Sequence, residues 1–93
     1  MDKAEAKAIL GVELGKYRAK PYRTLLSLLD KTEGLETRGE SGAWYQLKFH
    51  AAWDDKPNDV VRVFGAIDDG GWRAYFPLTD AFLMRPDGTF VDE

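Results

Sequence analysis

Cysteine is absent from the 93-residue chain, and histidine occurs only once, at position 50. Without cysteine there can be no disulfide scaffold, no thiolate zinc site and no cysteine nucleophile, so packing alone must stabilise the fold. The absence of cysteine also fits a reducing compartment, and we expect a cytoplasmic protein.

Long apolar runs are missing as well. No stretch approaches the roughly 20 apolar residues that a membrane-spanning helix needs, and the polar residues 1–5 lack the apolar region of a signal peptide. The formal net charge is −3, whereas duplex-binding proteins usually carry a basic field. We therefore expect neither a membrane nor a nucleic acid as a partner.

No motif for catalysis or nucleotide binding is present. His50 could act as a general base only beside a nucleophile or an orienting acid, and Ser41 lies in Glu40-Ser41-Gly42 rather than in a G-x-S-x-G elbow. Neither of the glycine-rich phosphate-binding patterns occurs, so Gly70-Gly71 indicates a hairpin turn. The sequence favours a non-enzymatic domain without a cofactor, and a catalytic role of His50 stays open as the alternative.

Acidic residues cluster in two predicted turns, at Asp54, Asp55 and Asp59 and at Asp68 and Asp69. Close carboxylates can bind calcium, but the spacing of an EF-hand loop is absent. Aspartate is also common in turns, because its side chain bonds the local backbone. We therefore expect no metal site.

The composition is that of an ordinary globular protein. Hydrophobic residues make up 44% and charged residues 31% of the chain, which argues against disorder. Aromatic residues make up 13%, and large rings bury much area per residue, which suits a small core. The length and the lack of a long linker predict a single domain over residues 1–93.

Helical signals fill the first third of the chain. Residues 2–16 are rich in helix formers, with Asp2 as the N-cap and Glu5 as its capping-box partner. Pro21 disfavours helix at the residue before it and suits the first position of a new helix. We predict a second helix from Pro21 to Lys31, with one kinked helix over residues 2–31 as the alternative.

After Gly34 the apolar period changes from about 3.6 to 2, which indicates strands. We expect strands over residues 35–39, 43–54, 60–68 and 72–78, and a closing hairpin of residues 81–84 and 89–91 around the turn 85–88. The fold class is therefore α+β, with an N-terminal helical segment packed on one face of a twisted four- to five-stranded antiparallel sheet. This layout resembles the helix-on-curved-sheet arrangement of cystatin-like domains.

The two faces of the sheet should differ. The odd positions from Ala43 to Trp53 should meet the helices, and the even positions should be wetter. If residues 72–78 keep Trp72 and Phe76 inside, aromatic and cationic side chains gather on the opposite, open face. These candidate binding residues are Trp44, His50, Arg62, Phe64, Arg73 and Tyr75.

Aromatic residues and arginine are enriched at binding hot spots, and an exposed patch of this kind usually marks a partner. We therefore expect a small protein-binding module acting through its open sheet face. The partner would be another protein or a second copy of the chain in a homodimer. The alternative is a small-ligand binder or minor enzyme, with a pocket between helix and curved sheet around His50, Asp54 or Arg62.

Overall fold

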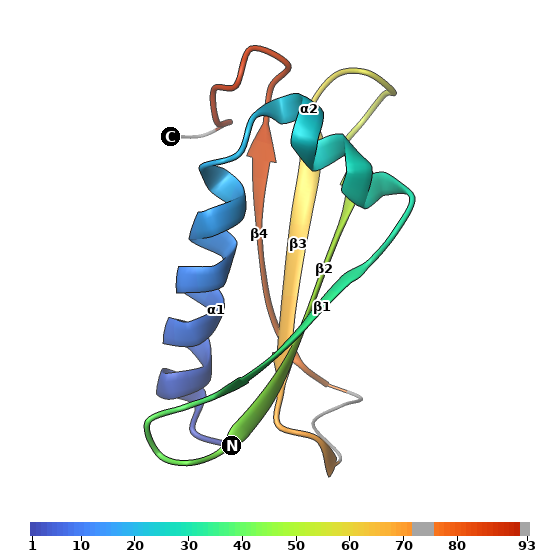
Figure 1. The fold of residues 1–93 in the computed structure, drawn as a ribbon. Coiled ribbons are helices and arrows are strands. Elements are labelled where there is room, and N and C mark those ends of the chain that lie inside the picture. The colour runs from blue at the N-terminus through green and yellow to red at the C-terminus, as the bar shows by residue number, and fades with distance from the viewer. Residues whose placement is uncertain (72–75, 92–93) are drawn as a thin grey trace.

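The computed structural model of the chain describes residues 1–71 and 76–91. Two helical segments precede a four-stranded sheet (Figure 1). The elements in chain order are α1 (Lys3–Arg18), α2 (Tyr22–Leu25), the 3-10 helix η1 (Leu26–Leu29), β1 (Glu33–Arg38), β2 (Trp44–Trp53), β3 (Val61–Asp68) and β4 (Leu78–Met84).

The sheet is an antiparallel meander in which every strand pairs with its neighbour in sequence, in the order β1-β2-β3-β4. All helices lie on one face: α1 contacts β3 and β4, and η1 contacts β2. The predicted fold class, an α+β fold with the helical segment on one face of a twisted antiparallel sheet, is confirmed. Among the helices of the described residues, none is long and apolar enough to cross a membrane.

The start of α1 follows from its cap. The side chain of Asp2 accepts a hydrogen bond from the backbone N–H of Glu5 at 3.0 Å, and this satisfies one of the N–H groups that a helix leaves unpaired at its first turn. Ala6, Leu10 and Leu14 lie one turn apart and are buried. This apolar stripe holds α1 against the sheet.

The second helical segment is shorter than predicted. Pro21 has an extended backbone (ψ 152°) and forms the N-cap, so residues 2–31 are not one kinked helix. After Leu25 the segment continues as η1, which ends at Leu29 with Asp30 as its C-cap, rather than at Lys31. A 3-10 helix has three residues per turn, and this places Leu25 and Leu28 on the same buried face.

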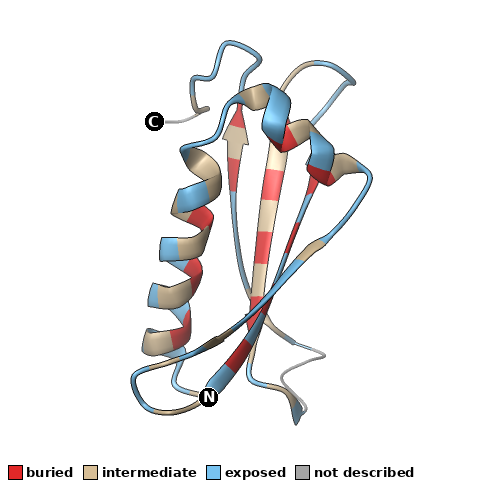
Figure 2. Ribbon diagram, in the orientation of Figure 1, coloured by how far each residue is buried: buried red, intermediate tan, exposed pale blue. Residues whose placement is uncertain are grey.

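The alternation predicted for the sheet is confirmed in β2 and β3. In both strands the odd positions are buried and the even positions are not, down to Ala51 in β2 (Figure 2). Tyr45, Leu47 and Phe49 of β2 meet Val63 and Ile67 of β3 in one core under the helices. The core therefore lies between the sheet and the helical layer.

The fourth strand differs from the prediction. It comprises Leu78–Met84 and pairs with β3 from Ile67↔Leu78 to Val61↔Met84, whereas residues 72–78 were expected to form it. Phe76, expected inside, is exposed, and residues 72–75 lie outside the described part. Pro77 has no N–H for the ladder, which explains why the pairing starts only after it.

The C-terminal residues return along β4. Gly88 N–H donates to the carbonyl of Arg85 at 2.8 Å, which closes the predicted turn. A single bridge joins Met84 to Phe90, and Val91 N–H donates to Leu83. The closing hairpin exists in this short form, with β4 as its first arm.

Candidate functional site

The face of the sheet that points away from the helices, called the outer face below, carries the candidate residues described by the structure. Trp44 and His50 come from β2, and Arg62 and Phe64 come from β3. All four occupy even positions, as the alternation predicted. Ala52, Ala66 and Ala81 lie on the same face, and so do the larger side chains of Gln46 and Lys48.

Trp44 lies at the start of β2 and is 60% exposed. It pairs across the strands with Arg38 of β1, whose guanidinium carbon lies 5.8 Å from the centre of the indole ring. The Nε of Arg38 also donates to the carbonyl of Gly42 at 3.2 Å. A cation beside an exposed indole is a favourable electrostatic pair, so the two side chains form one exposed unit.

His50 and Phe64 pair across β2 and β3, and their rings stack 4.8 Å apart at an angle of 15°. Arg62 lies 5.9 Å from the centre of the Phe64 ring and forms an ion pair with Asp54. His50 thus stacks on the ring of Phe64, and among residues 1–71 and 76–91 no nucleophile or acid is recorded as its hydrogen-bond partner.

Two predicted site residues, Arg73 and Tyr75, lie outside the described residues. The pocket of the small-ligand alternative was expected around His50, Asp54 or Arg62. His50 and Arg62 point away from the helices, so they do not line the groove that the structure shows on the helical side.

That groove runs between α1 and β1. One part of about 500 Å³ is lined by Ile9 and Val12 of α1 and by Thr37 of β1. A second part of about 460 Å³ shares Glu13 with the first and continues past Leu35. Both parts together are called the α1–β1 groove below. Val12 is 63% exposed and Leu35 is 39% exposed, so the groove has apolar walls that nothing in the described chain covers.

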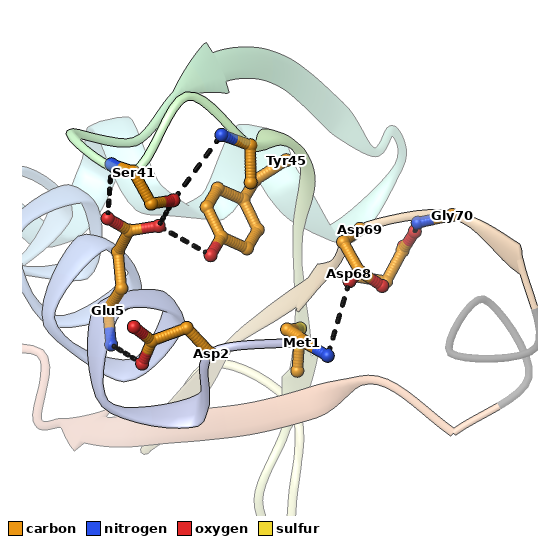
Figure 3. A network of polar contacts seen from close by, with 9 residues as sticks. Met1, Asp2, Glu5, Ser41, Tyr45, Asp68, Asp69 and Gly70 are labelled. Carbon is orange, nitrogen blue, oxygen red and sulfur yellow. Dashed lines mark hydrogen bonds and ion pairs between the residues drawn. The ribbon is translucent and has the colours of Figure 1, made fainter.

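Glu5, which lines the groove, belongs to a network of polar contacts (Figure 3). The Glu5 carboxylate accepts hydrogen bonds from the hydroxyl of Ser41 at 2.6 Å, from the backbone N–H of Ser41 at 3.0 Å and from the hydroxyl of Tyr45 at 2.7 Å. These bonds join α1 to the turn between β1 and β2. The bond from the Ser41 hydroxyl, followed by those from Tyr45 and from the Ser41 backbone, holds the pKa of Glu5 below its usual value.

The same network raises the pKa of Tyr45, whereas it lowers that of Glu5. The hydrogen bond to Glu5 and, after it, burial raise the pKa of Tyr45 to about 12.

The capping box predicted from Asp2 and Glu5 is only half formed. Asp2 caps the helix, but the Glu5 side chain bonds the β1–β2 turn rather than the Asp2 backbone.

Tyr17 and Glu33, which also line the groove, form a second contact between α1 and β1. The hydroxyl of Tyr17, near the end of α1, donates to the carboxylate of Glu33 at the start of β1. Burial and then this bond raise the pKa of Tyr17 well above its usual value. The sequence led us to expect a pocket between helix and sheet around His50, Asp54 or Arg62, whereas the groove is lined by residues of α1 and β1 that only the tertiary fold brings together.

Metal binding has no support in the part of the chain that the structure describes, where no group of three or more histidine, aspartate and glutamate side chains could hold an ion. Comparison with known proteins adds no further assignment. No family model, no curated protein and no solved structure matches this chain.

Proposed function

We propose that the protein is a small protein-binding module that engages a partner through the outer face of its sheet. The observation that carries this proposal is Trp44, which is 60% exposed and holds Arg38 beside its ring. Trp and Arg are the residues most enriched at the energetic centres of protein interfaces. The stacked pair of His50 and Phe64 extends the same surface across β3.

The charges of the outer face indicate the chemistry of the partner. Arg62 is paired with Asp54. Lys48 and Arg38 form no ion pair among residues 1–71 and 76–91. These two cations, with Glu36 between them on the same face, lie beside exposed aromatic rings and suit a partner that offers an apolar patch bordered mainly by carboxylates. The net charge of the whole chain is −3, and this argues against a polyanionic nucleic acid as the partner.

The proposal is tested by replacing Trp44 and Phe64 by serine, singly and together, and comparing quantitatively which proteins each variant retains. A buried tryptophan anchor contributes about 2 kcal/mol or more, so Trp44→Ser should weaken binding roughly 30-fold. Val12→Ser is the matched control, because Val12 is equally exposed but lies on the helical side. Near-UV circular dichroism verifies that each variant is folded.

Loss of the same partners in both outer-face variants, with retention by Val12→Ser, supports the proposal. Binding that is unchanged in a folded Trp44→Ser/Phe64→Ser double variant would contradict it.

A small-ligand binder is the second candidate, and the α1–β1 groove is the observation that favours it. Its volume lies within the range of ligand pockets, about 300–1,000 Å³. Three of the carboxylates at its rim are already engaged, however: Glu5 with Ser41 and Tyr45, Glu13 with Lys16, and Glu33 with Tyr17. A small molecule would thus meet few free groups to fix its orientation, and the outer face remains the better supported site.

A further inference from the structure

The two edges of the sheet differ in protection. The outer side of β4 is covered at its end by the returning chain, since Val91 N–H donates to Leu83 and Phe90 bridges to Met84, and Pro77 precedes the strand. Along β1 no such cover exists within the described chain, and β2 is its sole partner strand there. An unprotected edge presents free backbone groups to another strand, and proteins normally block such edges.

The outward-directed groups of β1 can be identified. Gly39 N–H donates to the carbonyl of Ala43, in register with the β1–β2 ladder. Because the direction of the backbone groups alternates along a strand, the odd residues of β1 bond β2 and the even residues direct their N–H and C=O groups outward. These even residues are Gly34, Glu36 and Arg38.

The α1–β1 groove lies beside this free edge. Val12 and Ile9 of α1 stand across it from Leu35 and Thr37 of β1. A strand added to β1 would direct its inward side chains toward these apolar walls. The free edge could therefore pair with a fifth strand, and the groove would accommodate the side chains of that strand on the helical side.

We propose that a second copy of this chain supplies that strand, with β1 pairing antiparallel to β1 of the other copy about a two-fold axis at Thr37. The charges of β1 are self-complementary in this register. Glu36 lies directly opposite Arg38 of the other copy, and Arg38 lies opposite Glu36, on the outer face. Opposite charges at such positions stabilise a strand pair, and like charges destabilise it.

Neighbouring registers are less favourable. A shift of the axis to Glu36 places two carboxylates opposite each other, and a shift to Arg38 places two guanidinium groups opposite each other. An axis at Leu35 keeps the outward backbone groups paired but loses both opposite-charge pairs. A two-fold axis perpendicular to the sheet also keeps the helices of both copies on one side, so the exposed Val12 faces the added strand. This interface shares Arg38 with the outer-face site, but Trp44 lies on β2, one strand away from the pairing edge.

The test is a charge exchange followed by mass measurement. The parent should show an increase in mass from 10.5 kDa to twice that value as its concentration rises in sedimentation velocity. Glu36→Arg alone places arginine opposite arginine, and Arg38→Glu alone places glutamate opposite glutamate. Each single variant should therefore remain monomeric at concentrations where the parent is dimeric.

Two combinations should restore the dimer. The double variant Glu36→Arg/Arg38→Glu regains opposite charges in each copy. An equimolar mixture of the two single variants should form heterodimers, because one chain then carries both arginines and the other both glutamates. Lys7→Glu is the matched control: it changes one charge on an exposed position of α1 and should leave the dimer intact.

A parent that is monomeric at every concentration would overturn the proposal, and so would a dimer that both single variants retain. Because Arg38 also bonds Gly42, near-UV circular dichroism verifies its variant, and Glu36→Arg provides the same test without that contact. The Trp44→Ser variant should dimerise like the parent, so failure of the outer-face proposal and failure of this one are distinguishable.

Discussion

Replacing Gly65 by alanine should destabilise the protein, although the same change usually stabilises a strand. Gly65 lies in β3 beneath α1, and a Cβ atom at this position would lie 2.9 Å from Cδ1 of Leu10 and 2.9 Å from Cε1 of Phe49. Both neighbours are buried, at 2% and 1% exposure. Neither can turn away without losing its own packing, so α1 or the Phe49 ring must shift.

The expected size follows from two opposing effects. Overpacking a well-filled core costs about 1–3 kcal/mol, and alanine recovers roughly 0.4–1 kcal/mol by restricting the unfolded chain. The net loss should be about 1–2 kcal/mol, from a total of about 5–14 kcal/mol for a domain of this length. With a urea m-value of about 1–3 kcal/mol/M, the midpoint should fall by roughly 1 M.

Urea unfolding followed by tryptophan fluorescence, at one fixed protein concentration, measures this shift. Gly11→Ala is the control, because Gly11 is an exposed helical position with no atom within 4 Å of the added Cβ. It should raise stability by roughly 0.5–1 kcal/mol. A Gly65→Ala variant as stable as the parent would refute the close approach of α1 to β3. Combination with Leu10→Ala should cost less than the sum of the single changes, since the new methyl group enters the vacated space.

Three further predictions concern the polar contacts and one turn. Because the folded pKa of Glu5 is lowered, its carboxylate stabilises the fold above pH 4.5, the unfolded value, and this stabilisation is lost as the pH falls through the folded pKa. Glu5→Gln should therefore flatten the acid limb of a plot of stability against pH. An unchanged acid limb would contradict this. Tyr45 has a folded pKa of about 12 against 10.0 for the free side chain, so its contribution is full below pH 10 and is lost toward pH 12. Phenolate absorbance should thus rise later in the native protein than in urea, and coincident curves would contradict this. Asn58 has a φ of 65°, so Asn58→Ala should cost about 1 kcal/mol in urea unfolding and Asn58→Gly close to nothing; equal losses would contradict the left-handed turn.

The sheet and its two faces could be predicted from sequence because side-chain alternation is a local property. In β2 the period of two runs without interruption from Trp44 to Trp53, and burial on one face alone fixes the register. The N-cap at Asp2 could be predicted for the same reason, because the backbone N–H that it accepts from belongs to Glu5, three residues along the chain. Trp44, His50, Arg62 and Phe64 were placed together for the same reason.

The start of β4 and the length of the second helix were predicted wrongly, because both depend on contacts between residues distant in the sequence. A strand was expected to end at Leu78, but the register of β3 pairs Ile67 with Leu78, so that β4 begins there and runs to Met84. The second helix was predicted to run from Pro21 to Lys31, but after Leu25 the segment continues as the 3-10 helix η1, which ends at Leu29. Both errors arise where a short pattern fits two structures and tertiary pairing selects between them.

Glu5 shows how such selection shapes the free edge of the sheet. Its position fits a local capping box, yet its carboxylate bonds Ser41 and Tyr45 instead. Together with the bond from Tyr17 to Glu33, this fixes β1 against α1 at two points, about 12 residues apart on the helix and therefore roughly 18 Å apart along its axis. Between these points Val12 lines the α1–β1 groove and is exposed. An edge that is held in this way needs little ordering when another strand pairs with it, and ordering is one of the main costs of association. The two bonds thus connect the stability of the fold to the interface that we propose.

Tyr17→Phe, which removes one bond without changing a charge, should weaken self-association more than it lowers the stability of the monomeric Glu36→Arg variant. Equal effects on association and on stability would show that the bond serves the fold alone.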